Sequence, residues 1–334
     1  MLRKTLPAAL ICFALLACSI TPAYAQIASR HFTFRYEFTV RNTDPGQRLR
    51  VWAPLAQSDQ FQDVKVVSMD GDLPLRKTRE RVFGDEMLYA ETAKADKPEY
   101  HFAVVYDIVR RERIADLHHA PQPRLLRLSA SESEMYLKPD RLVPTTGLPA
   151  EIAAKQVQGS HTQIEKARAI YEYVFQNMKY DKTGTGWGRG DTLYACDAKK
   201  GNCTDFHSLF ISMARSQGIP ARFEIGFPLP ADKTSGEVAG YHCWSDFYVE
   251  GIGWVPVDIS EAWKHQEKHD YFFGAHDANR VQFSMGRDIV LSPKQDGEPL
   301  NYFVYPYVEL GGRAYPNVSN KFAFEEAAAS MAAR

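Results

Sequence analysis

The first half of the chain alternates large apolar residues with polar ones. The clearest run is Phe32–Arg41, which ends at the turn-forming residues 42–46. A period of two is typical of a half-buried β-strand. Several short strands at this spacing predict an antiparallel sandwich or half-barrel over residues 26–145. Further runs of the same type occupy residues 49–53, 64–68, 87–92 and 100–110.

The period changes near Pro144. Residues 162–180 place apolar side chains three and four apart, which predicts an amphipathic helix. A second apolar stripe runs through residues 203–215, with Asn202 as its N-cap and Gly218 as its stop. This order predicts an α+β fold in which one helix packs against an antiparallel hairpin. The strand-like runs that follow the helix are residues 221–227, 241–249 and 254–259.

The N-terminus has the features of a secretory signal. Residues 1–25 contain two basic residues, no acidic residue and an apolar run, and they end in the small-x-small site Ala23-Tyr24-Ala25. We therefore expect cleavage after Ala25 and a periplasmic or secreted protein. The alternative is a lipoprotein anchored at Cys18, because Leu15-Leu16-Ala17-Cys18 loosely resembles a lipobox. No later apolar stretch approaches the ~18–20 residues that a membrane span needs.

Composition narrows the class of protein. The 334 residues are 45% apolar and 24% charged with a net charge of −1, which is ordinary for a folded globular protein. Basic residues form no excess, so a nucleic-acid partner is not expected. At ~150 residues per domain the length suggests two domains. The patterns divide the chain into a β-sandwich-like domain at 26–145, a catalytic domain at 146–320 and a tail at 321–334.

Three residues have the types and order that thiol catalysis needs. Cys203 begins a helix, where unpaired N–H groups and the helix dipole lower the pKa of a thiol. His242 could act as its base, and Asp258 could orient the imidazole. An odd-numbered hairpin loop would place His242 and Asp258 on one sheet face, with Cys203 meeting the imidazole from the covering helix. We predict a Cys-His-Asp catalytic triad without a cofactor or metal.

These residues stand in blocks that resemble the bacterial transglutaminase-like superfamily. The blocks are Gly201-Asn202-Cys203-Thr204-Asp205, Gly218-Ile219-Pro220-Ala221-Arg222, His242-Cys243-Trp244 and Gly253-Trp254-Val255-Pro256-Val257-Asp258. The resemblance implies a papain-like core and a triad at Cys203, His242 and Asp258. It also implies an amide substrate in a protein or peptide, because the superfamily contains transglutaminases, peptidases and deamidases.

Two further expectations concern groups around the nucleophile. Cys243 follows the histidine and should point away from the triad face, so we expect it to pair with Cys196 in a disulfide. The backbone N–H of Cys203 is one oxyanion donor. Tyr180 and Trp187 lie upstream, where a second donor could come from.

Two alternatives belong to other classes of protein. A zinc-binding protein could use Cys203, His207 and His242, although their spacing matches no standard zinc module. A periplasmic binding protein with a vestigial site is the other alternative, with the β domain capturing its partner. The pair His118-His119 is interpreted as surface, and the Gly-rich residues 183–191 lack a Walker A signature.

Overall fold

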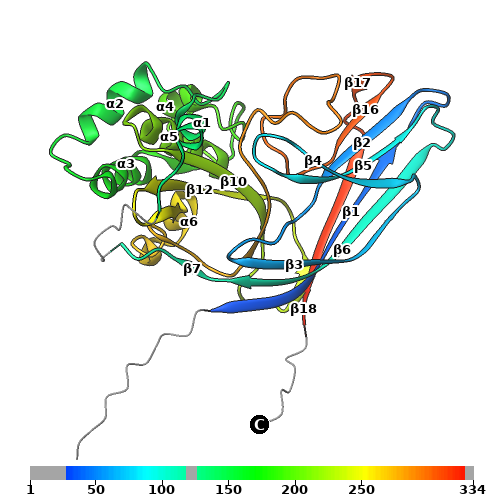
Figure 1. Ribbon diagram of the computed structural model, residues 1–334, viewed down its shortest axis with the longest axis horizontal. Coiled ribbons are helices and arrows are strands. Elements are labelled where there is room, and N and C mark those ends of the chain that lie inside the picture. The colour runs from blue at the N-terminus through cyan, green and yellow to red at the C-terminus, as the bar shows by residue number, and fades with distance from the viewer. Residues whose placement is uncertain (1–27, 118–125, 328–334) are drawn as a thin grey trace, which may run out of the picture.

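The computed structural model describes residues 28–117 and 126–327 (Figure 1). The expected signal at 1–25, Cys18 and the pair His118-His119 lie outside the described residues. Within those residues no helix combines the length and the apolar character that crossing a membrane would need.

Two five-stranded antiparallel sheets form the β half of the molecule. One has the order β11-β18-β1-β6-β3 and the other the order β17-β16-β2-β5-β4. Alternate side chains of the first predicted strand are buried, from Phe32 to Val40, and they share one core with the second sheet. The strands are β1 (Ser29–Arg41), β2 (Leu49–Pro54), β3 (Gln62–Gly71), β4 (Leu75–Arg79), β5 (Glu86–Thr92), β6 (Glu99–Arg111), β11 (Ser235–Glu237), β16 (Tyr307–Leu310), β17 (Arg313–Ala314) and β18 (Val318–Glu326).

The end of the chain returns to the first sheet. Strand β18 pairs with β1 along its whole length, with Phe324 opposite Phe34, and β16 pairs with β2. In Figure 1 the red β18 runs beside the blue β1. The expected division at residue 320 therefore does not coincide with a boundary in the structure, because it falls inside a strand. Its short alternation, with only Phe322 and Phe324 as large apolar residues, is a weak strand signal.

The second half packs helices around a four-stranded sheet of order β13-β12-β10-β15. The predicted helix at residues 203–215 is its centre, because every residue from Cys203 to Arg215 is buried. The α+β class with a helix on an antiparallel sheet is confirmed. The elements are α1 (Ala130–Leu137), α2 (Leu148–Gln156), α3 (Gln163–Asn177), α4 (Thr192–Ala198), α5 (Cys203–Ser216), α6 (Ile259–Lys264), β10 (Ala221–Pro228), β12 (His242–Val249), β13 (Gly253–Val257) and β15 (Arg280–Met285).

Short elements complete the connections. The pairs are β7 (Arg113–Ile114) with β14 (Ala275–His276) and β8 (Lys179–Tyr180) with β9 (Lys200–Gly201), and a 3₁₀ turn spans Gln266–Lys268.

Aromatic side chains join the two halves into one core. Phe227 of β10 lies 5.4 Å, between ring centroids, from Phe34 of β1 and 4.4 Å from Phe322 of β18. Phe283 of β15 stacks on Tyr36 with centroids 5.4 Å apart. The four-stranded sheet is therefore packed directly on the β half, and the two halves share one core.

Candidate active site

Cys203 is the first residue of α5, and a network of caps fixes the turn on which it lies. The Asn202 side chain accepts from the backbone N–H of Thr204 at 3.0 Å, and Asp205 accepts from that of Asn202 at 2.9 Å. Asp205 also accepts from Gly188 and Gly190 at 2.7 and 3.0 Å, so the Gly-rich loop is held against the helix. Asn202 is the N-cap that the sequence predicts, and together with Asp205 it forms a capping box, which leaves the Cys203 thiol at the positive end of the helix.

His242 and Asp258 come together at one end of the sheet. The hairpin has three residues between the paired Val249 and Gly253, which is the odd-numbered loop that the sequence analysis required. His242 begins β12, and Asp258 follows β13 as the N-cap of α6. His242 Nε2 donates to Asp258 Oδ2 at 2.7 Å, and both residues are buried. Since Nε2 is occupied, Nδ1 is the nitrogen left for the hydrogen bond that joins His242 to Cys203.

The electrostatics of these three groups favour a charged pair. Burial by itself would raise the pKa of Cys203, but hydrogen bonds from Cys243 and His242 and the charge of His242 bring it well below its usual value. Burial would likewise lower the pKa of His242, yet Asp258 outweighs burial and raises it to about 10. The site therefore favours a thiolate beside an imidazolium at neutral pH.

Arg280 is a partner of the site that sequence analysis missed. Its Nη1 donates to Asp258 Oδ2 at 2.9 Å, and its guanidinium lies 4.8 Å from the Trp244 ring centroid. Burial acts to raise the pKa of Asp258, but the charge and hydrogen bond of His242 and the charge of Arg280 hold it well below its usual value. An arginine at the start of an apolar strand gives no sequence signal for this role, because the contact is set by the packing of β15 beside β10.

His207 lies one turn after Cys203 and supports the site as a neutral ring. Its Nε2 accepts from the backbone N–H of Ile259 at 3.1 Å, so the proton is on Nδ1, which lies 3.7 Å from Cys243 Sγ. Burial lowers the pKa of His207 to about 4. The zinc alternative loses a ligand, since both nitrogens are occupied. Over residues 28–117 and 126–327 no group of three or more His, Cys, Asp or Glu side chains could hold a metal ion.

The expected disulfide between Cys196 and Cys243 is not formed, and all three described cysteines are free. Cys243 does point away from the sheet face of its neighbour His242, but that other face is the one covered by α5. There its thiol is hydrogen-bonded to Cys203 and lies against His207. Cys196 lies in α4, where burial raises its pKa to about 11.

The two expected oxyanion donors have different surroundings. Trp187 Nε1 donates to Gly184 O at 3.1 Å, so its only side-chain donor is used within its own loop. Burial and the charge of Cys203 raise the pKa of Tyr180 to about 12. Its hydroxyl is therefore protonated at neutral pH. Tyr241 was not singled out in the sequence. Burial and the charge of Cys203 raise its pKa, and its hydroxyl accepts from Asn202 Nδ2 at 3.0 Å.

The chain is similar to known proteins in sequence. The family model described as the transglutaminase-like superfamily matches residues 150–259. An uncharacterized protein of Haemophilus influenzae is 31% identical over 317 residues, covering 84% of this chain and 85% of its own length. The uncharacterized protein YebA of Bacillus subtilis is 27% identical over 144 residues, which are 38% of this chain and 20% of YebA.

A solved structure shares the fold over most of the chain. It is a protein of Cytophaga hutchinsonii described as a candidate cysteine protease, with a TM-score of 0.60 and 13% identity. The match covers 89% of this chain and 92% of that protein.

Proposed function

We propose that this chain, which belongs to the transglutaminase-like superfamily, is a cysteine-dependent enzyme that transfers the acyl group of an amide through a Cys203 thioester. One observation carries the proposal. A buried cysteine begins helix α5, with a lowered pKa and hydrogen-bonded to a histidine that itself donates to Asp258 at 2.7 Å. This is the arrangement that nucleophilic thiol catalysis requires.

The first half of the reaction forms the thioester. The Cys203 thiolate attacks the carbonyl carbon of the amide, and the negative charge moves to the carbonyl oxygen. The imidazolium of His242 then gives its Nδ1 proton to the nitrogen of the departing amine as the C–N bond breaks. Asp258 keeps the ring oriented through Nε2 and stabilises its charge.

The oxyanion needs donors that are already in place. The backbone N–H of Cys203 has no acceptor among the described residues, since the Asn202 side chain takes the N–H of Thr204 instead. We propose this N–H as one donor and the protonated Tyr180 hydroxyl as the second. Trp187 is not proposed, because its indole N–H is bound to Gly184.

The second half of the reaction decides the type of enzyme. Water attacking the thioester gives a peptidase or a deamidase, and a lysine amine gives a transglutaminase. We propose a protein or peptide amide as the substrate. The test is incubation with a dipeptide library, with and without an amine acceptor, and identification of the products by mass.

Variants of two cysteines make this test specific. Cys203→Ala should abolish turnover, whereas Cys196→Ala should keep it, because Cys196 lies in α4 and has a raised pKa. Activity that survives in Cys203→Ala would refute the mechanism. If wild-type protein gives no product and Cys203 reacts with no thiol probe near neutral pH, the chain is a binding protein with a vestigial site.

We also propose that the enzyme acts outside the cytoplasm. The support is the sequence of residues 1–25, with its basic start, apolar run and Ala-Tyr-Ala site. N-terminal sequencing of the purified protein would find Gln26 first if the signal is removed after Ala25.

A further inference from the structure

A cavity of about 900 Å³ lies on the sheet face opposite α5. Arg222 and Glu224 of β10 line it, whereas Ile225 pairs with Cys243 on the face that meets the helix. Successive strand residues point to opposite faces, so cavity and helix are on different sides of the sheet. Cys203 is not among the lining residues. The volume is within the range of small-molecule sites.

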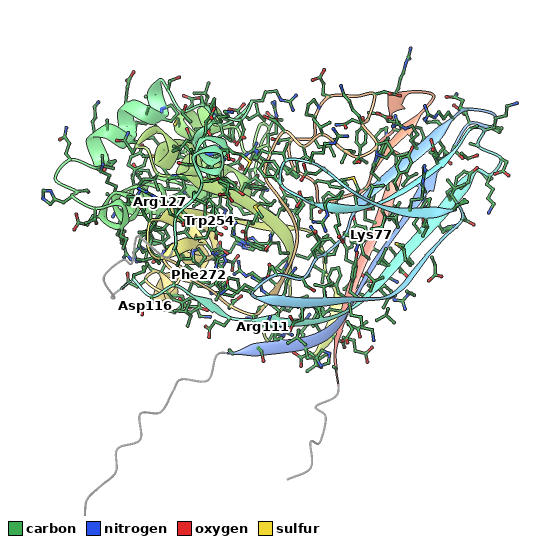
Figure 2. The ribbon with its side chains drawn as sticks, in the orientation of Figure 1. Lys77, Arg111, Asp116, Arg127, Trp254 and Phe272 are labelled. Atoms are coloured by element: carbon green, nitrogen blue, oxygen red, sulfur yellow. The ribbon has the colours of Figure 1, made fainter. Side chains whose placement is uncertain are left out.

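The remaining walls come from the β half and from the β12–β13 hairpin. Residues 57–62, Arg110 and residues 113–116 form one side, and Tyr248 and residues 251–254 form another. Figure 2 labels Asp116 and Trp254 of the lining, and also Arg111, which does not line the cavity. The cavity thus lies at the junction where the four-stranded sheet β13-β12-β10-β15 meets the β half.

Arg110 lines this cavity with an incompletely satisfied guanidinium. The residue is 1% exposed, and its Nη1 donates to Gln62 Oε1 at 3.2 Å. Its Nε has no hydrogen-bond partner, and it forms no ion pair, within residues 28–117 and 126–327. Burial lowers the pKa of Arg110 to about 10, which still leaves it charged at neutral pH. A buried charge without a partner is costly, so a ligand anion would be favoured here.

The neighbouring arginines, Arg113 and Arg222, do have carboxylate partners. Arg113 Nη1 donates to both oxygens of Asp246 at 3.2 and 3.0 Å. Arg222 donates to Asp246 at 3.0 and 2.7 Å and pairs with Glu224 at 2.6 Å. Arg113 and Arg222 are thereby held in ion pairs, whereas Arg110 forms no ion pair among the described residues.

Other acidic groups near the cavity are engaged elsewhere. Asp59 Oδ1 accepts from the backbone N–H of Gln62 at 2.7 Å. Burial raises the pKa of Asp85 well above its usual value, and this carboxyl accepts from the Met285 N–H at 3.0 Å. Asp116 has a partner of its own. Asp59 and Glu224 therefore act on Arg110 only through their charge, and no carboxylate of the described residues forms an ion pair with it.

The aromatic side chains of the cavity suit an apolar group. Phe61 lies under the Arg113 guanidinium at 4.8 Å, and Trp254 lies under that of Arg222 at 4.3 Å, each measured to the ring centroid. These cation–π contacts help to hold both rings in place. Phe83 and Tyr248 also line the cavity.

We propose that this cavity binds a ligand that carries a carboxylate beside an apolar group, with Arg110 as the partner of the carboxylate. A guanidinium offers paired N–H donors that match a carboxylate. The carboxylate could belong to a small acid or to the C-terminus of a peptide. This inference does not depend on the acyl-transfer proposal, since the nucleophile lies outside the cavity.

The test is calorimetric titration of the full chain at pH 7 with four probes. These are N-acetylphenylalanine, its amide, the tripeptide Ala-Ala-Phe and the amide of that tripeptide. We expect each acid to bind at least about tenfold more tightly than its amide, because a charge-assisted pair is lost in the amide. Tighter binding of the tripeptide acid would identify a peptide end, and equal binding of the two acids would identify a small acid.

Neighbouring arginines provide a matched pair of variants. Arg110→Gln should weaken binding of the acids by about tenfold or more, while Arg111→Gln, which removes an exposed pair with Asp63, should bind like the wild type. The melting temperature of ligand-free Arg110→Gln should not fall, because its guanidinium has no ion-pair partner among the described residues. Equal affinities for acid and amide, an unchanged affinity in Arg110→Gln, or no binding of either acid would overturn the proposal.

Discussion

The charge state of Cys203 can be measured through the pH dependence of its alkylation. A thiol of ordinary pKa, about 8.5, is roughly 0.3% thiolate at pH 6 and loses tenfold in rate for each pH unit below that pKa. The pKa of Cys203 is held well below this value by Cys243 and His242 against the effect of burial. Its alkylation rate should therefore be nearly flat between pH 6 and pH 8.

The size of the effect on the Cys203 alkylation rate depends on Asp258. The rise in the pKa of His242 from 6.5 to about 10 corresponds to roughly 5 kcal/mol of stabilisation of the imidazolium, for which Asp258 is the main source. In Asp258→Asn that source is removed, so the thiolate loses its cationic partner. We expect the alkylation rate at pH 6 to fall by roughly 10- to 100-fold, because the greater nucleophilicity of a more basic thiolate offsets part of the lost thiolate fraction.

The assay is reaction with iodoacetamide from pH 5 to pH 9, followed by mass spectrometry of the peptide that contains Cys203. Cys196 is an internal control, because its pKa is raised to about 11 and its rate should keep rising with pH. The matched variant is Asp277→Asn, which removes the other carboxylate of Arg280, at 3.3 Å, and leaves the bond from His242 to Asp258 intact.

The burial of Cys203, at 2% exposure, lowers the absolute rate but not the shape of the profile. A wild-type rate that rises tenfold per pH unit up to pH 8.5 would refute the ion pair. A flat profile that persists in folded Asp258→Asn would refute the role of the carboxylate. Near-UV circular dichroism would establish that the variant is folded.

Other perturbations test the surroundings of the site. Arg280→Met leaves the buried Asp258 carboxylate without its 2.9 Å guanidinium partner, so urea unfolding should show a loss of roughly 3–5 kcal/mol, and a loss below about 1 kcal/mol would argue against the pair. Cys243→Ala removes a hydrogen bond to the nucleophile, so the inflection of the alkylation profile should move to higher pH at nearly unchanged stability. Phe322→Ala opens the aromatic cluster that joins the two halves and should cost about 3–5 kcal/mol in one cooperative transition; two separate transitions would contradict the shared core. In melting temperature against pH, His242 contributes stability that is present below about pH 6.5 and is lost as pH rises through about 10, while Asp258 contributes stability that is present above about pH 4 and is lost as pH falls through its lowered pKa.

The sequence was most informative where a local pattern, such as a helix cap or a hairpin loop, positions a residue of the candidate site. The helix of Cys203 could be predicted from Asn202 and the apolar stripe, because capping and periodicity are local properties. The meeting of His242 and Asp258 followed from the odd-numbered hairpin loop. By contrast, β4 has one apolar residue in five, Leu75, and no alternation from which it could be predicted.

Contacts between distant segments could not be predicted. Arg280 reaches Asp258 only because β15 lies beside β10, and a single sequence does not specify that pairing. The direction of Cys243 was predicted correctly relative to His242, but the sequence did not show which face α5 covers. That missing information produced the expected disulfide with Cys196, which the structure does not form.

The return of β18 to β1 has a consequence for the order of folding during synthesis. Phe34 pairs with Phe324, so β1 cannot complete its sheet until nearly the whole chain has left the ribosome. At about 5–20 residues per second, the 290 residues from 35 to 324 take on the order of 15 to 60 s, during which the β18 side of β1 has unsatisfied backbone groups. The β half and the second half should therefore reach their native state together, and ribosome-bound chains that lack residues 318–326 should be open to strand addition by other chains.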